Sequence, residues 1–172
     1  GFKMTDYPEN SLEVLETILK RKELLDACAG FEFDICFTKD HIPVVLHDKY
    51  IDDITNEEGF VRNYSFDELR KMNFQFRKSQ GNYANTLQYK VVSLESLLDF
   101  FQDSLPLLEE KVIKIETKDY LLSNRDNVTT KNLRALACIL QKYPDLANNM
   151  IHLSFWPLNL AILKKVQKKK NY

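Results

Sequence analysis

The chain has 172 residues, of which 44% are hydrophobic and 28% are charged, and its formal net charge is −1. This composition fits one globular domain with a sizeable core and excludes a largely disordered chain. The charge balance gives no indication of binding to nucleic acid or an anionic membrane, and no apolar run reaches the roughly 18 residues of a membrane-spanning helix.

The first predicted element is a helix near the N-terminus. Pro8 and Asn10 are typical of a helix start. We expect the helix to run to about Ala27 and to end by Gly30, because apolar residues after Asn10 recur at helical spacing. These residues are Leu12, Leu15, Ile18 and Leu19.

Two short strands are predicted next. Residues 31–37 (FEFDICF) alternate strictly, so that the apolar side chains face one way while Glu32, Asp34 and Cys36 face the other. Residues 42–46 predict a second strand. The link between the two segments is too short for a helical crossover between parallel strands. They therefore form a hairpin, or the first strand runs long.

The rest of the chain alternates between helices and strands after a polar insertion at about residues 49–90. Within the insertion, Ser65 and Glu68 have the spacing of a capping box and predict one short helix. The later predicted elements are a helix after Ser93, a strand over 112–116, a helix over 129–143, a strand over 150–155 and a helix after Pro157. Strands that alternate with helices are typical of an α/β fold, and we expect one domain over residues 1–172.

Three carboxylates lie on predicted strands. Glu32 and Asp34 are two residues apart, so their side chains project from the same face of a strand. Two like charges this close repel each other unless a positive charge lies between them. Mg²⁺ or Ca²⁺ would supply that charge, with Glu116 at the end of a later strand as a third ligand. The alternative is an exposed edge strand whose carboxylates face water.

His47 and Lys118 are further candidates for chemistry. His47 follows a predicted strand and could act as general acid or base, although a structural histidine is the commoner case. Lys118 lies two residues after Glu116 and could hold an anionic group, or it could be an ordinary surface lysine. His41 lies in a turn that tolerates positive φ, and His152 is expected to be structural.

Five segments together resemble the glycerophosphodiester phosphodiesterase family. Members of that family typically carry His-Arg-Gly, then Pro-Glu-Asn-(Thr/Ser)-Leu-Glu, Glu-x-Asp, Pro-Val-Val-x-His-Asp, Glu-x-Lys and a Ser-Phe pair. The matching segments occur in the same order: PENSLE at 8–13, EFDICFTKDHIPVVLHD at 32–48, TNEEG at 55–59, IETK at 115–118 and LSF at 153–155.

The resemblance implies a (β/α)₈ TIM barrel, of which this chain would hold about five of the eight strand units. It implies metal-dependent hydrolysis of glycerophosphodiesters to glycerol 3-phosphate and an alcohol, with Mg²⁺ or Ca²⁺ as cofactor. The implied site has three metal ligands, two catalytic residues and one phosphate contact: Glu32, Asp34 and Glu116; His47 and Glu9; and Lys118. The partner would be a small phosphodiester, without nucleic acid or stable membrane insertion.

The sequence departs from the family pattern at several points. Gly1 aligns with the glycine of His-Arg-Gly, so the first of two acid–base histidines would lie immediately upstream. We expect the sequence to be a portion of a longer protein, because about five strand units do not close a barrel. Asp53 stands where the family often has arginine, and His41 replaces a turn glycine. The alternatives are a non-catalytic metal- or phosphate-binding relative and a related barrel phospholipase or lyase acting on intact lipids.

Cysteine usage bears on the compartment. Cys28, Cys36 and Cys138 are too scattered for a disulfide framework and contain no C-x-x-C pair. An odd count fits a reducing compartment, and the first ten residues do not form a signal peptide. We therefore expect a cytoplasmic protein, with export left open because a leader could have been removed.

Overall fold

Strands and helices alternate along the described residues of the computed structural model, which are 10–74, 89–108, 110–118 and 128–168. Four strands lie within these residues: β1 (Gly30–Phe37), β2 (Pro43–Val45), β3 (Val112–Thr117) and β4 (Met150–Leu153). The helices there are α1 (Leu12–Lys20), α2 (Lys22–Ala27), α3 (Phe66–Lys71), α4 (Leu94–Asp103), α5 (Val128–Leu140) and α6 (Pro157–Lys168). Short 3₁₀ turns are η1 (Val61–Asn63), η3 (Leu105–Leu107) and η4 (Pro144–Leu146). No helix of the described ranges is long and apolar enough to cross a bilayer.

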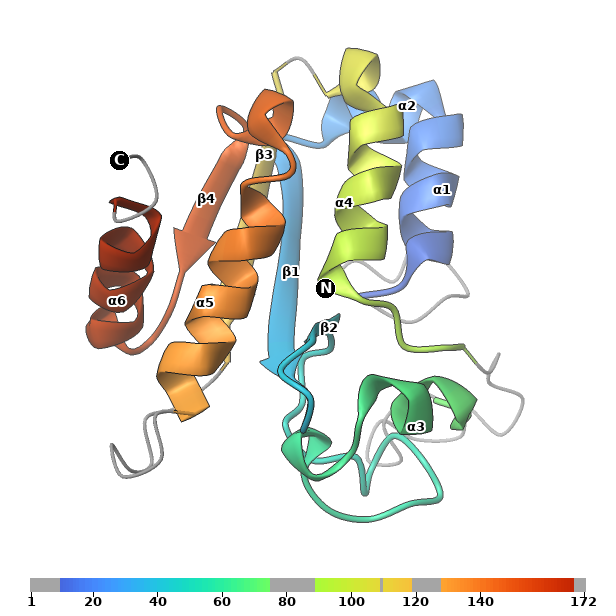
Figure 1. The fold of residues 1–172 in the computed structure, drawn as a ribbon. Helices are drawn as coiled ribbons and strands as arrows, with labels where there is room; N and C mark the ends of the chain where they lie inside the picture. Colours follow the sequence, from blue (N-terminus) through green and yellow to red (C-terminus); the bar gives the residue numbers. More distant parts are fainter. Residues whose placement is uncertain (1–9, 75–88, 109, 119–127, 169–172) are drawn as a thin grey trace.

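The strands form one sheet in the order β2-β1-β3-β4 (Figure 1). β1 runs parallel to β3, and β3 runs parallel to β4. β2 instead pairs antiparallel with the end of β1, with Ile35 opposite Val45. The two segments left open by the sequence are therefore a hairpin. His41 lies in its turn at φ 65°, as the sequence predicts, and its Nδ1 lies 2.7 Å from Asn132 Oδ1 of α5.

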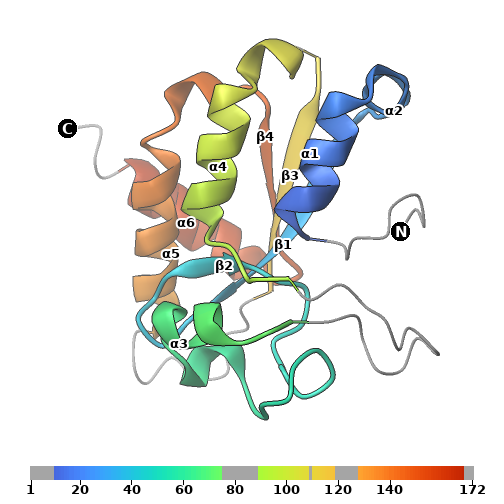
Figure 2. The ribbon, with the colours of Figure 1, turned by 90° about the vertical axis from the view of Figure 1, so that its right-hand side faces the viewer.

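Helices cover one face of the sheet. α4 and α5 lie side by side against it, as Figures 1 and 2 both show. The largest apolar cluster joins these helices to alternate residues of β1 and β3, among them Phe31, Phe33, Ile35, Ile113, Ile115, Leu97, Leu98, Phe101, Leu133 and Leu136. The strict alternation of β1 therefore turns its aromatic side chains toward the helices. It turns Glu32 and Asp34 toward the opposite face.

The N-terminal helix is broken, whereas the sequence predicts one helix to about Ala27. Arg21 adopts an extended backbone between α1 and α2. In a continuous helix, positions 22, 23 and 26 would lie on the same buried face as Leu15, and all three are charged. The break ends that unfavourable register and lets Leu25 join Leu15 in the main apolar cluster.

The described part of the polar insertion shares a second apolar cluster with the β1–β2 hairpin. Its buried members are Cys36, Val44, Leu46, Ile51, Ile54, Val61, Leu69, Phe74 and Val91. α3 begins with the predicted capping box, in which the Ser65 hydroxyl accepts a hydrogen bond from the Glu68 backbone and the Glu68 carboxylate accepts one from the Ser65 backbone. The insertion therefore packs against the β1–β2 hairpin, at the carboxyl end of β1 (Figure 1).

Gly30 allows β1 and β3 to pair closely. A Cβ at this position would lie 2.1 Å from the carbonyl oxygen of Val112, the residue opposite it in the parallel register. We expect Gly30→Ala to lower the free energy of unfolding by about 2 kcal/mol or more, because the backbone of β3 must move. Urea denaturation followed by circular dichroism measures this, with the exposed neighbour variant Ala29→Ser expected within about 0.5 kcal/mol of wild type. Equal stability of both variants would contradict the expectation.

Candidate metal centre

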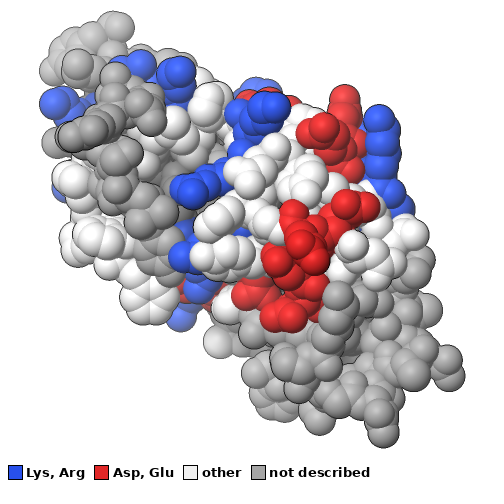
Figure 3. Space-filling view, turned by 90° about the horizontal axis from the view of Figure 1, so that it is seen from below, with Lys and Arg blue, Asp and Glu red and all other residues white. Residues whose placement is uncertain are grey.

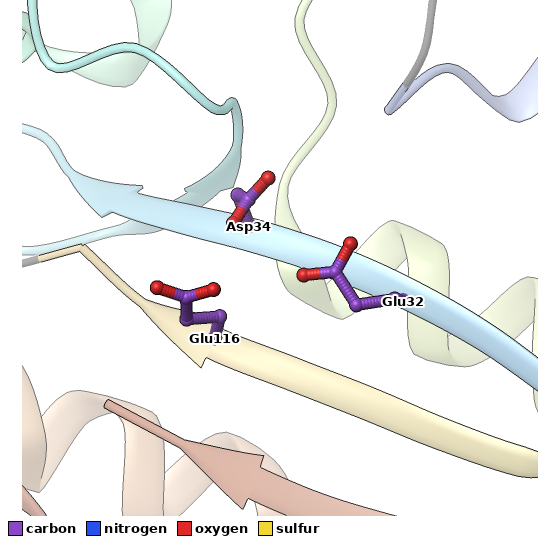
Figure 4. A group of neighbouring side chains, drawn as sticks. All are labelled: Glu32, Asp34 and Glu116. Carbon is purple, nitrogen blue, oxygen red and sulfur yellow. The ribbon is translucent and has the colours of Figure 1, made fainter. Parts of the chain in front are cut away.

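The register between two parallel strands brings three carboxylates together. Asp34 of β1 lies directly opposite Glu116 of β3, and Glu32 precedes Asp34 by two residues on the same face. One oxygen from each of the three side chains lies within 4.8 Å of the others. Figure 4 shows Glu32 and Asp34 on β1 and Glu116 on the neighbouring β3, with their carboxylates turned toward one another. The structure therefore brings the three predicted ligands into one cluster.

The cluster concentrates negative charge in a partly dehydrated place. Asp34 is only 4% exposed, Glu116 is half-buried and Glu32 is exposed at the rim. Partial burial, with repulsion from Asp34 and then Glu116, raises the pKa of Glu32 above its ordinary value. Because the three ionised carboxylates repel one another here, a cation bound between them would lower the electrostatic energy of the site.

Lys118 lies at the same cluster. Its Nζ is 2.8 Å from Glu116 Oε1 and 3.0 Å from Asp34 Oδ1. Burial alone would lower the pKa of Lys118, but hydrogen bonds to Glu116 and Asp34 outweigh it, and the net pKa is raised. Nζ also lies 5.5 Å from the centre of the Phe155 ring. The lysine is therefore part of the site and not an ordinary surface residue.

The donor set fits a hard divalent cation. Asp34 Oδ1 is buried, and the Lys118 ammonium 3.0 Å away balances part of its charge. Carboxylate oxygens are preferred ligands of Ca²⁺ and Mg²⁺, and two oxygens on opposite sides of one ion are about 4–5 Å apart. The 4.8 Å spread of the three ligand oxygens meets that limit.

His47 comes two residues after the end of β2 and lies near Glu32 of the carboxylate cluster. Its Nδ1 lies 2.9 Å from Asp48 Oδ1, and its side chain is 43% exposed. It is close enough to Glu32 to lower the pKa of that group, although this effect is smaller than those of burial, Asp34, Glu116 and Lys118. Glu9, the other predicted catalytic residue, lies outside the described residues.

Asn10 is a neighbour of the cluster that the sequence interpretation assigned only to a helix start. Its Nδ2 donates to Asp34 Oδ2 at 3.4 Å, and the Asp34 backbone N–H donates to Asn10 Oδ1 at 3.3 Å. Asn10 has φ 62°, a conformation that asparagine tolerates better than most residues. The sequence signal for a role of Asn10 in the site was its place beside Glu9 in the PENSLE segment. Its contact with β1 is seen only in the folded chain.

His152 of β4 lies apart from this chemistry. Burial lowers its pKa, and its Nδ1 is buried without a hydrogen-bond partner among the described residues. In the β3–β4 register it lies opposite Ile115, whose side chain belongs to the main apolar cluster. These surroundings agree with the structural role expected for it.

The carboxyl ends of β1 and β4 point to the lower end of the molecule in Figure 1. Seen from below, acidic side chains gather over part of that end, with basic side chains to one side (Figure 3). A face with this charge raises the local concentration of cations.

Comparison with known proteins identifies the family. The model of the glycerophosphoryl diester phosphodiesterase family matches residues 3–172. The chain belongs to this family. A curated glycerophosphodiester phosphodiesterase from Caldanaerobacter subterraneus is 31% identical over 156 residues, covering 84% of this chain and 61% of the relative.

Solved structures of family members share the fold. A structure from Silicibacter pomeroyi assigned as a glycerophosphoryl diester phosphodiesterase matches with a TM-score of 0.75 and 19% identity, over 92% of this chain and 56% of its own. A phosphodiesterase from Oleispira antarctica, solved with the product sn-glycerol-3-phosphate, matches with a TM-score of 0.67 and 18% identity, over 95% and 59%. The predicted TIM-barrel type is confirmed, and the described strands form a partial barrel sheet. The chain spans less than two thirds of each of these relatives.

Proposed function

We propose that this protein is a metal-dependent phosphodiesterase that hydrolyses glycerophosphodiesters to glycerol 3-phosphate and an alcohol. The observation that carries the proposal is the cluster of Glu32, Asp34 and Glu116 with Lys118 on one face of a barrel-type sheet. Membership of the family supports it, as does the product bound to the Oleispira relative.

Each residue of the cluster has a distinct role in this proposal. Glu32, Asp34 and Glu116 hold Mg²⁺ or Ca²⁺, and Asn10 keeps Asp34 in place through both its backbone and its carboxylate. A bound ion would neutralise the phosphodiester and stabilise the charge that develops in the transition state. Lys118 provides a second positive charge for a phosphate oxygen on the same face.

His47 transfers a proton in this proposal. The ionised Asp48 carboxylate accepts a hydrogen bond from Nδ1–H, which makes Nε2 the basic nitrogen. Hydrolysis requires that the attacking oxygen lose a proton as the new P–O bond forms. This oxygen comes from water directly, or from the glycerol 2-hydroxyl to give a cyclic phosphate that water opens in a second step. The leaving alkoxide gains a proton as the old P–O bond breaks. Two acid–base groups are therefore needed, and His47 supplies one of them in this proposal.

Release of choline from glycerophosphocholine tests the function. We expect choline and glycerol 3-phosphate in equal amounts with Mg²⁺ or Ca²⁺, and no release after treatment with EDTA. Lysophosphatidylcholine in the same assay tests the alternative of a lipid substrate. That alternative is favoured by the exposed apolar side chains of Phe155, Trp156 and Leu158, which the sequence interpretation did not foresee and of which the Phe155 ring lies beside Lys118. If neither phosphodiester is cleaved with either ion, the proposal that this protein is a phosphodiesterase is wrong.

A further inference from the structure

The ammonium of Lys118 occupies the place of a counter-ion at two of the candidate metal ligands. It contacts Glu116 Oε1 and Asp34 Oδ1, and both side chains belong to the three-carboxylate cluster. An ion would lie about 2.4 Å from an oxygen of each carboxylate. If those oxygens stayed paired with Lys118, a divalent and a monovalent cation would lie only a few ångströms apart. The two cations would then repel each other, which favours occupancy of the carboxylate pair by one of them at a time.

We propose that Lys118 and the divalent cation are alternative counter-ions of the Asp34–Glu116 pair, so that binding of the ion releases Lys118 to contact the substrate phosphate. The inference rests on the proposed function, since it assumes that the carboxylates bind an ion. It adds an exchange step, in which the lysine holds the site together until the ion arrives.

The surroundings of Asp34 explain why the ion-free protein needs this lysine. Asp34 is almost fully buried, and its register position directly opposite Glu116 brings two carboxylates together. Without a cation between them the two groups repel each other. The Lys118 ammonium supplies that cation from within the chain.

The backbone and side chain of Lys118 are suited to such an exchange. Its backbone N–H donates to the Ile35 carbonyl at 2.9 Å, which fixes the residue at the end of β3 beside β1. The side chain has a flexible stem of four carbons, so the ammonium can move while the backbone stays. The exposed ring of Phe155, 5.5 Å from Nζ, offers a cation–π contact to the displaced ammonium.

Calorimetric titration with Ca²⁺ tests the exchange in wild type and three variants. We expect Lys118→Met to bind Ca²⁺ at least about tenfold more tightly than wild type, because the internal competitor is gone. Lys118→Arg keeps a positive charge, and Lys114→Met removes an exposed charge from the same face of β3, opposite Glu32. Both are expected within about threefold of wild type. Equal or weaker binding by Lys118→Met, or an equal rise in Lys114→Met, would overturn the exchange.

A second measurement follows the lysine in the unmodified protein and does not depend on folding of a variant. The ¹⁵N signal of the Lys118 ammonium, assigned by comparison with Lys118→Arg, should shift or broaden as Ca²⁺ saturates the site. An unchanged signal at saturation would overturn the inference. If neither wild type nor Lys118→Met binds Ca²⁺ or Mg²⁺, the proposed function fails together with the exchange. If wild type and Lys118→Met bind Ca²⁺ with equal affinity, the exchange is wrong but the proposed function is not.

Discussion

Replacing Asp34 with asparagine should abolish measurable binding of Ca²⁺ and lower phosphodiester cleavage by about 10³-fold. The substitution keeps the shape of the side chain and removes its negative charge. Asp34 is the most buried of the three carboxylates and the one that faces both Glu116 and Lys118. Loss of one electrostatic contribution to a transition state commonly costs about 10²–10³ in rate, and loss of the ion adds to that. Calorimetry and choline release measure the two effects.

An exposed aspartate in the insertion provides the matched control. Asp53→Asn removes the same charge from a solvent-exposed position and is expected to leave Ca²⁺ affinity and activity within about twofold of wild type. Both variants should have the circular dichroism spectrum of wild type. Retention of full Ca²⁺ affinity by Asp34→Asn would remove Asp34 from the ligand set.

Replacing His47 with alanine should separate the chemistry from ion binding. We expect activity to fall by about 10²–10⁴-fold, the usual contribution of a general acid or base, while Ca²⁺ affinity stays within about twofold of wild type. The histidine is paired with Asp48 and supplies none of the three ligand oxygens, so its removal leaves the ligand carboxylates in place. Initial rates of choline release at saturating Ca²⁺ give the comparison. Unchanged activity would exclude His47 as a proton-transfer group.

Local signals in the sequence predicted much of the fold. The alternation of residues 31–37 specified β1 and the two faces of its side chains, because successive side chains of a strand point in opposite directions. Ser65 with Glu68 and Ser93 marked the starts of α3 and α4 through their backbone contacts. The break at Arg21 was missed because the apolar spacing that predicted the helix is a local signal. The break itself places Leu25 in the main apolar cluster, which depends on the folded chain.

The candidate site divides in the same way. Glu32 and Asp34 share a face by strand periodicity alone, so their proximity is a local property. Their meeting with Glu116 depends on the parallel register of β1 and β3, which pairs residues more than eighty positions apart. Spacing could not supply that register; the place of Glu116 at the end of a predicted strand made the meeting possible, and the family resemblance indicated it. The contacts of Asn10 and Lys118 with Asp34 likewise depend on the folded chain.

Anomalous diffraction from crystals soaked in Mn²⁺, a carboxylate-binding ion that can replace Mg²⁺, tests the central claim most directly. We predict one strong peak about 2.2 Å from an oxygen of each of Glu32, Asp34 and Glu116, with the Lys118 ammonium moved away from Asp34. A peak at other residues, or no peak between these three carboxylates at saturating Mn²⁺, would contradict the metal centre and the function built on it.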